Sequence, residues 1–400
     1  MVTSSPAPRV TVETMPTARI GSLIEFASPS RPLYYRHGDI EIVGIGELCR
    51  WTASGERRFD ALGSLWASFT ETVPKEHRKH LVALTSGSFD PLGPADLVVP
   101  RVAIIRRGRD VTTVSFGGDD AAIEPVRKSI GAAPAVEWPH IDSVYRDRVR
   151  AALARLNENF GKVVVARAIT GTVTATGDER APLQTLTTDY PDTHIFAFDG
   201  LWGASPETLV DVVDSRVHAR VLAGSAARGW DSASDGAAAS GLASSTKDLD
   251  EHAYAVGSVV SALSRHCRAV VGAAVPFTLR LANVWHLASD ITAVIARRST
   301  IFDLVDALHP TAAVAGVPTA SALAAIAEVE AIPRERYAGP IGWVDAQGNG
   351  EFAIALRCAQ WTETGIVAHA GAGIIADSDP ESEYAETELK FRPIREALVG

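Results

Sequence analysis

The stretch from His369 to Lys390 changes abruptly from small residues to acidic ones. Its first part, His369–Ile375, alternates alanine and glycine, which leave room for backbone N–H groups to approach an anion closely. Asp379 is a good helix N-cap, and Pro380 fits the first helical position that follows it. The sequence therefore predicts a glycine-rich segment that leads directly into a helix beginning at Pro380.

On that helix two acids and a lysine share one face. Glu383, Glu386 and Lys390 follow one another at i, i+3 and i+7, which is helical spacing. Carboxylates gathered in this way can hold a metal ion, although the same pattern also fits a solvated charged face. From these residues alone both interpretations stay open.

Composition limits the class of protein. The 400 residues are 46% hydrophobic and 22% charged, as in soluble globular proteins, and the net charge is -10. This charge argues against binding to nucleic acid or to an anionic membrane. No apolar run approaches the ~20 residues of a membrane span. The 3 cysteines are widely spaced, so neither a disulfide framework nor a CxxC zinc site is expected. We expect a cytoplasmic protein.

The first 19 residues are rich in Ser, Pro and Thr, and we expect a flexible lead before a single catalytic domain over residues 20–400. Short apolar runs at 40–45, 81–85 and 98–105 predict strands, and 59–69 predicts a helix. This N-terminal quarter carries no chemical motif, so we expect it to be scaffold.

The middle of the chain contains two candidate catalytic residues. A helix is predicted over 141–157, followed by a buried strand that begins at Lys162. Glu207 lies between a turn and an apolar run, where an acid is buried unless it is partnered or protonated. Residues 222–246 are heavy in Gly, Ala and Ser, and by composition they could be a linker.

Four further residues are candidates for a functional role. Ser245 begins a capping pattern, and Asp248 and Glu251 lie one turn apart on the helix that follows. His286 lies in an apolar strand, where a histidine is more often a core residue than a functional one. Arg357 also lies inside an apolar strand and needs a carboxylate partner from the protein or from a ligand.

Taken together, these segments resemble the chorismate-utilising enzymes, the family of isochorismate, salicylate, anthranilate and aminodeoxychorismate synthases. The resemblance runs from about residue 85 to 390. It implies an α+β fold in which large antiparallel sheets enclose a buried site and helices lie outside. The segments that match in order and spacing are Lys162–Arg167, Gly203–Glu207, Leu222–Ser225, Lys247–His252, Trp285–Leu287, His309–Thr311, Ala355–Arg357, Ala370–Ile374 and Glu383–Lys390.

The resemblance implies a set of ligand-binding residues. Four carboxylates look like the Mg²⁺ site, and four acids brought together would indeed repel without a cation or protons. Arg357 and Tyr337 resemble the pair that binds the enolpyruvyl carboxylate. The metal set is Asp248, Glu251, Glu383 and Glu386, and the other substrate-binding positions are Gly224, Ser225, His286, Ala313, Gly371, Gly373 and Lys390.

A few positions favour one subfamily. Lys162 resembles the base that activates water in isochorismate and salicylate synthases, where anthranilate synthases carry glutamine. Ala223 stands where aminodeoxychorismate synthases place a nucleophilic lysine. Ala313 stands where salicylate synthases usually carry threonine. We therefore expect an isochorismate synthase, with salicylate synthase and a non-catalytic chorismate-binding subunit as alternatives.

The expected reaction adds water at C2 of chorismate and removes the C4 hydroxyl. Lys162 is the expected general base and Glu207 the expected general acid, so burial or neighbours must shift both pKa values from roughly 10.4 and roughly 4.3. The product could feed siderophore or menaquinone synthesis. Because water is the nucleophile, no glutaminase partner is expected, and we expect a monomer.

Overall fold

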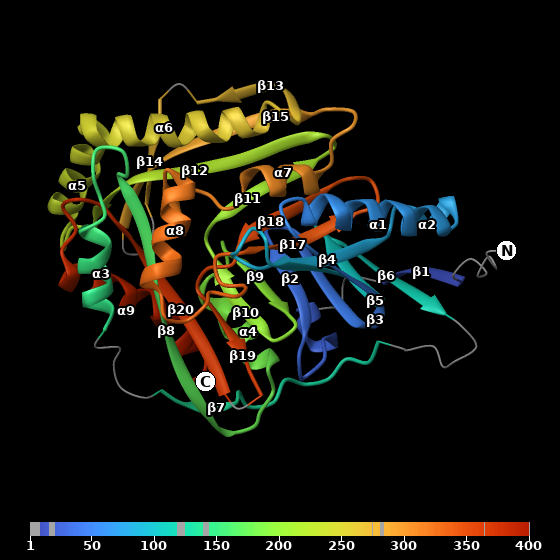
Figure 1. The fold of residues 1–400 in the computed structure, drawn as a ribbon. Helices are drawn as coiled ribbons and strands as arrows, with labels where there is room; N and C mark the ends of the chain where they lie inside the picture. Colours follow the sequence, from blue (N-terminus) through green and yellow to red (C-terminus); the bar gives the residue numbers. More distant parts are fainter. Residues whose placement is uncertain are drawn as a thin grey trace.

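The computed structural model describes residues 9–15, 21–117, 125–138, 144–273, 275–280, 284–363 and 365–399. Helices lie around a large sheet (Figure 1), which confirms the predicted α+β class. The helices are α1 Arg58–Thr72, α2 Lys75–Arg78, α3 Tyr145–Leu153, α4 Arg180–Asp189, α5 Ser232–Ser244, α6 Thr246–Leu263, α7 Ile301–Leu308, α8 Thr319–Val329 and α9 Pro380–Ala397, with the 3-10 turn η2 Leu23–Phe26.

Strands in the described ranges pair antiparallel throughout, and they join into one continuous sheet of 20 strands. The strands are β1 Arg9–Met15, β2 Leu33–His37, β3 Ile40–Ser54, β4 Val82–Gly87, β5 Pro94–Arg107, β6 Asp110–Gly117, β7 Ala135–Glu137, β8 Lys162–Ala175, β9 His194–Phe198, β10 Leu201–Ser205, β11 Thr208–Val213, β12 Arg216–Ala227, β13 Cys267–Gly272, β14 Phe277–Arg280, β15 Val284–Ile295, β16 Gly316–Val317, β17 Pro340–Asp345, β18 Gly350–Ile354, β19 Cys358–Trp361 and β20 Gly365–Ile374.

The long strand β8 lies at the centre of the site region. Its buried run Val163–Ala166 explains the near-continuous apolar sequence, because both faces of this strand are covered. Every residue of β20 pairs with a residue of β8, so that Gly373 lies opposite Val164 and Gly371 opposite Ala166. Helix α9 then packs back onto β20 (Figure 1), and its Lys390 reaches the carbonyl of Gly371.

Helix α9 begins as predicted. Asp379 is the N-cap, and its side chain accepts a hydrogen bond from the backbone N–H of Ser382, while Pro380 is the first helical residue. The predicted strands and helices of residues 40–105 are also present, and β3 and β5 extend well beyond the predicted runs.

Part of the expected N-terminal lead is ordered. Residues Arg9–Met15 form β1, which pairs with β6 over its full length from Arg9 opposite Gly117 to Met15 opposite Val111. Val10 and Val12 pack against the core from this strand, and that burial offsets the entropy of ordering a Ser- and Thr-rich segment. The remainder of residues 1–19 lies outside the described residues.

Two local predictions were wrong. Residues 222–246 are not a linker: they form the end of β12 and the helix α5, where Asp231 and Ser234 make a capping box. Alanine is a strong helix former, so a composition rich in Ala and Ser is compatible with either state. Arg357 is not inside a strand either, because it lies between β18 and β19 with a φ of 47°.

The helices in the described ranges are too short or too polar to cross a membrane.

Candidate active site

Lys162 begins β8, and its side chain passes over Gly373 of β20, where there is no side chain to block it. Its Cε would lie 3.0 Å from a Cβ built on Gly373, so the glycine makes room for the lysine stem. Its Nζ lies 3.4 Å from Oε1 of Glu251 on α6. Lys162 therefore bridges from the β8–β20 pair to the helix that carries two of the predicted metal ligands.

Glu207 lies between β10 and β11, and its backbone is held on both sides. Its N–H donates to the Ser205 hydroxyl at 3.2 Å, and its carbonyl accepts from the N–H of Ile354 at 3.0 Å. Burial raises the pKa of its carboxyl to about 7, against the opposing charges of Lys162, Arg357 and Lys390. A carboxylic acid that keeps its proton near neutral pH is the form that can donate it.

Arg357 is held by its backbone in a left-handed conformation. Its carbonyl accepts a hydrogen bond from the N–H of Ala204 at 3.1 Å, in close approach to Gly203. Burial lowers the pKa of the guanidinium, while Tyr337, Glu386 and Glu207 favour its charged form. Within the described part of the chain the guanidinium has no hydrogen-bond or ion-pair partner, so it is available to a ligand anion.

Lys390 on α9 reaches the open edge of β20. Its Nζ donates to the carbonyl of Gly371 at 2.8 Å and forms an ion pair with Glu386. The N–H and C=O of one residue face the same side of a strand, so the Gly371 N–H points to this edge as well. Gly373 is two residues further along β20, and its peptide groups face the same way. Burial lowers the pKa of Lys390, against the charge of Glu386.

The four predicted metal ligands come from two helices. Asp248 and Glu251 lie in the first turns of α6, and Glu383 and Glu386 lie in those of α9. Burial and the neighbouring Glu386 charge raise the pKa of Glu383, although a hydrogen bond from Ser378 opposes that rise. In the described ranges these four carboxylates do not form a compact cluster, because Glu251 faces Lys162 and Glu386 faces Lys390.

His286 lies on β15 opposite Ser225 of β12, beside a bulge at Gly224. Burial and, after it, the nearby charge of Lys390 lower the pKa of His286 to about 4, so the imidazole is neutral at pH 7. Gly224 has a φ of 74°, and a Cβ there would lie 3.2 Å from the Cβ of Asp248. The bulge therefore links His286 to the first turn of α6. The Ser225 side chain lies outside the described part.

Tyr337 is buried, and its ring stacks on His369 with centroids 5.2 Å apart and planes 15° apart. Sequence reasoning missed His369 as a site residue. It lies two residues before Gly371, and this i, i+2 spacing places it on the same face of β20 as both glycines, which was a readable signal. Ala313 is half-buried in the loop that precedes β16.

The geometry brings most of the predicted residues into one region. Electrostatic interactions connect Glu207 with Lys162, Arg357 and Lys390, and they connect His286 with both lysines and Glu386. Three basic side chains thus surround Glu207 in a chain of net charge -10, and two of them, Lys162 and Lys390, are also paired with acids of α6 and α9. Such a region can bind a small anion at its basic groups and hold a proton at Glu207.

Comparisons with known proteins identify the family. A sequence model described as "Chorismate binding enzyme" matches residues 128–399. The chain belongs to the chorismate-binding enzyme family. Isochorismate synthase EntC of Escherichia coli K12 is 30% identical over 320 residues, which cover 78% of this chain and 80% of EntC. A Mycobacterium tuberculosis protein that bears the name MenF is 41% identical over 359 residues, covering 84% of this chain and 94% of that protein.

A solved structure has the same fold. The menaquinone-specific isochorismate synthase MenF from Escherichia coli superposes with a TM-score of 0.82, covers 98% of this chain and 95% of its own, and is 24% identical. At that identity the likeness concerns the fold. It supports the predicted arrangement of large antiparallel sheets with helices outside.

Proposed function

We propose that this member of the chorismate-binding family is an isochorismate synthase that requires Mg²⁺. The observation that carries the proposal is Glu207, a half-buried acid whose pKa is raised to about 7 and which interacts electrostatically with Lys162 and Arg357. The family supplies the substrate class, and the residue types at the site favour water as the nucleophile. The proposal includes the full set of site residues predicted from the sequence.

Substrate binding rests on Arg357, Tyr337 and Lys390. The guanidinium of Arg357 offers two parallel N–H groups to one substrate carboxylate. Lys390 and the outward-facing amides of Gly371 and Gly373 lie where the second carboxylate would bind. His286, Gly224, Ser225 and Ala313 would line the rest of the pocket.

The reaction exchanges a hydroxyl group between two ring carbons. The Lys162 amine removes a proton from a water molecule, whose oxygen forms the new bond at C2 of chorismate. The ring double bond shifts and the C4–O bond breaks, while Glu207 donates its proton so that the hydroxyl departs as water. Atoms balance, because one water enters, one leaves, and a proton moves from Glu207 to Lys162 across the ring.

The chemistry of the acids fits Mg²⁺. All four side chains offer oxygen ligands, which Mg²⁺ prefers, and Mg²⁺ binds through few carboxylates while keeping waters. Burial together with the charge of Glu386 raises the pKa of Glu383, a like-charge stress that a dication relieves. We propose Glu251 and Glu386 as inner ligands, with Asp248 and Glu383 supporting them. When bound, Mg²⁺ supplies positive charge for the substrate ring carboxylate.

The test is to incubate the purified protein with chorismate, with and without Mg²⁺, and to separate the products by liquid chromatography. We expect isochorismate in equilibrium with chorismate, and only with the metal. Salicylate together with pyruvate would identify a salicylate synthase and would show that Ala313 does not prevent pyruvate elimination. Unchanged chorismate in the presence of Mg²⁺ would overturn the proposal in favour of a binding subunit.

A further inference from the structure

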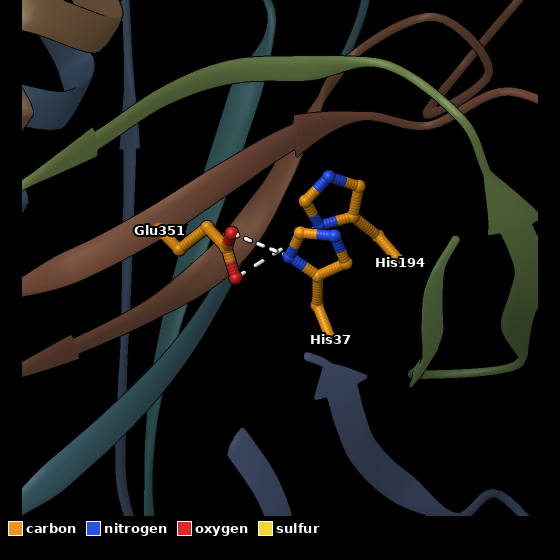
Figure 2. A group of neighbouring side chains, drawn as sticks. All are labelled: His37, His194 and Glu351. Atoms are coloured by element: carbon orange, nitrogen blue, oxygen red, sulfur yellow. Dashed lines mark hydrogen bonds and ion pairs between the residues drawn. The ribbon is translucent and has the colours of Figure 1, made fainter. Parts of the chain in front are cut away.

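A second group of metal-ligating side chains lies outside the candidate active site. His37 ends β2, His194 begins β9 and Glu351 lies in β18, and one ligand atom from each lies within 4.8 Å of the others (Figure 2). Nδ1 of His37 is 2.7 Å from Oε1 of Glu351, and Nδ1 of His194 is 3.9 Å from Oε2. His194 is buried, whereas the side chain of His37 is 30% exposed, so the group is reachable from solvent.

The side chains that contact this group form hydrogen bonds of the kind that orient metal ligands. Nε2 of His194 is 2.8 Å from the Thr208 hydroxyl, a partner that can accept its proton and leave Nδ1 free to bind an ion. The Tyr35 hydroxyl is 2.9 Å from that Nδ1 and 3.1 Å from Oε2 of Glu351. In this tautomer the single Tyr35 proton faces two acceptors and can serve only one of them, so the other is available to a bound ion.

Strand register adds an independent observation. Glu351 of β18 lies directly opposite Asp211 of β11, and Asp211 in turn lies opposite His218 of β12. Directly opposed residues share one face of a sheet, and like charges in such a pair are destabilising. Two carboxylates thus face each other beside the imidazoles of His37 and His194. A cation placed among them would reverse that repulsion.

We propose that His37, His194 and Glu351 form a binding site for a divalent cation of the zinc class, with Asp211 as a second carboxylate nearby. Imidazole with carboxylate suits Zn²⁺, whereas Mg²⁺ prefers oxygen ligands alone. The site would connect strands that are distant in sequence, so its role is to stabilise this part of the sheet. None of its residues belongs to the candidate active site.

Binding requires one local movement. The rings of His37 and His194 stack with centroids 3.7 Å apart and planes 28° apart. An ion is bound in the plane of an imidazole, so two stacked rings do not both point at a common ion. The His37 ring, which is the more exposed of the two, turns toward the shared position, while Thr208 holds His194 in place through Nε2.

The experiment uses the full chain after treatment with a chelator. Zn²⁺ is titrated in competition with a chromophoric chelator, and thermal unfolding is recorded with and without Zn²⁺. We expect one Zn²⁺ per chain, a higher melting temperature with Zn²⁺, and no displacement by excess Mg²⁺. His37→Ala should weaken binding by at least about tenfold. Thr208→Val, which removes only the hydroxyl that contacts Nε2 of His194, should weaken it by roughly 10- to 100-fold.

Two controls separate this site from other metal binding. His77→Ala removes a histidine on α2 outside the cluster and should leave Zn²⁺ affinity unchanged. Glu386→Gln removes a candidate Mg²⁺ ligand and should leave the Zn²⁺ stoichiometry unchanged, even if turnover of chorismate is lost. Wild-type protein that does not bind Zn²⁺ would overturn the proposal. So would equal Zn²⁺ affinity in wild type, His37→Ala and Glu351→Gln.

Discussion

Glu207 interacts electrostatically with three basic side chains of the candidate site, Lys162, Arg357 and Lys390. A carboxyl group withdrawn from water must be partnered or protonated. In the fold, burial outweighs the charges of Lys162, Arg357 and Lys390 and raises its pKa to about 7. An ordinary glutamate near 4.5 would be ionised at neutral pH and could not act as an acid.

This pKa gives a prediction for activity. If Glu207 donates a proton to the leaving hydroxyl, its protonated form is required, so turnover should fall as the pH rises through about 7. Glu207→Gln cannot donate an acidic proton and should lower kcat by roughly 10²- to 10⁴-fold. Steady-state rates between about pH 5 and pH 9 would measure both effects. A wild-type rate that is flat across this range would contradict the assignment.

The same shift predicts the stability of the variant. Between about 4.5 and about 7 the folded state binds more protons at Glu207 than the unfolded state, so the contribution to stability is lost as the pH rises. Glu207→Gln mimics the neutral form and should be more stable than wild type above pH 7, by on the order of 1 kcal/mol. Urea unfolding at about pH 4 and about pH 8 would test this, and the difference should vanish only below about 4.5, where the carboxyl is protonated in the unfolded state as well.

Lys162 gives a second prediction at this scale. Its one ion pair, at 3.4 Å to Glu251, is partly exposed and contributes little to stability. Lys162→Ala should therefore unfold within about 0.5 kcal/mol of wild type, yet lose roughly 10²- to 10⁴-fold in kcat. Lys75→Ala, an exposed lysine on α2, is the matched control and should keep full activity. Full turnover in Lys162→Ala would eliminate the proposed base.

Residue types could be predicted from the sequence, but contacts could not. The need of Arg357 for an anion stays a prediction. Its left-handed backbone was not visible in the sequence, because that conformation accompanies the close approach of its carbonyl to Gly203 across the sheet. His369 was missed because its stacking on Tyr337, which lies 32 positions earlier, exists only in the folded chain, and its one signal in the sequence was the spacing of two residues from Gly371.

At the scale of elements, the bulge in β12 links strand and helix. Gly224 has a φ of 74°, and its missing Cβ leaves room for Asp248 and Leu287, each 3.2 Å from a Cβ built there. A composition of Gly, Ala and Ser suggested a linker for residues 222–246, but this region is ordered as strand, capping box and helix. Composition describes propensity, whereas burial against α6 and β15 determines the outcome.

A pair of glycine substitutions tests this bulge. Gly224→Ala should destabilise the fold by roughly 1–3 kcal/mol, because an alanine is strained at this φ, and it should lower activity by displacing His286 and the start of α6. Gly257→Ala, inside α6 with no atom within 4 Å of the new Cβ, should instead stabilise by about 0.5–1 kcal/mol. Urea unfolding of both variants decides the matter, and a Gly224→Ala protein as stable as wild type would rule out the strain.

At the scale of the molecule, the sequence predicted the fold class but not which strands pair with one another. Apolar runs identified strands in every region, and the family resemblance implied antiparallel sheets around a buried site. The joining of all strands into one sheet depends on pairs such as β1 with β6 and β20 with β8, which are far apart in the chain. The match to a solved isochorismate synthase at a TM-score of 0.82 agrees with the predicted class.

The proposed Mg²⁺ site joins two parts of this sheet. Helix α6, which carries Asp248 and Glu251, packs on β12, β13 and β15, whereas α9, which carries Glu383 and Glu386, packs on β20 and α3. A ligand held by both helices should therefore stabilise the whole molecule. The gain follows RT ln(1 + [L]/Kd), about 2.7 kcal/mol at a ligand concentration of 100 Kd.

We therefore predict that Mg²⁺ and chorismate together raise the melting temperature more than the sum of their separate effects. Substrate and metal share charges in one site, so each should increase affinity for the other. Glu251→Gln and Glu386→Gln should each abolish the joint increase and the Mg²⁺-dependent turnover. Asp250→Asn changes an exposed acid between the two proposed ligands of α6 and should keep both. If Asp250→Asn lost as much as Glu251→Gln, the effect would reflect general surface charge, and a metal site spanning α6 and α9 would be excluded.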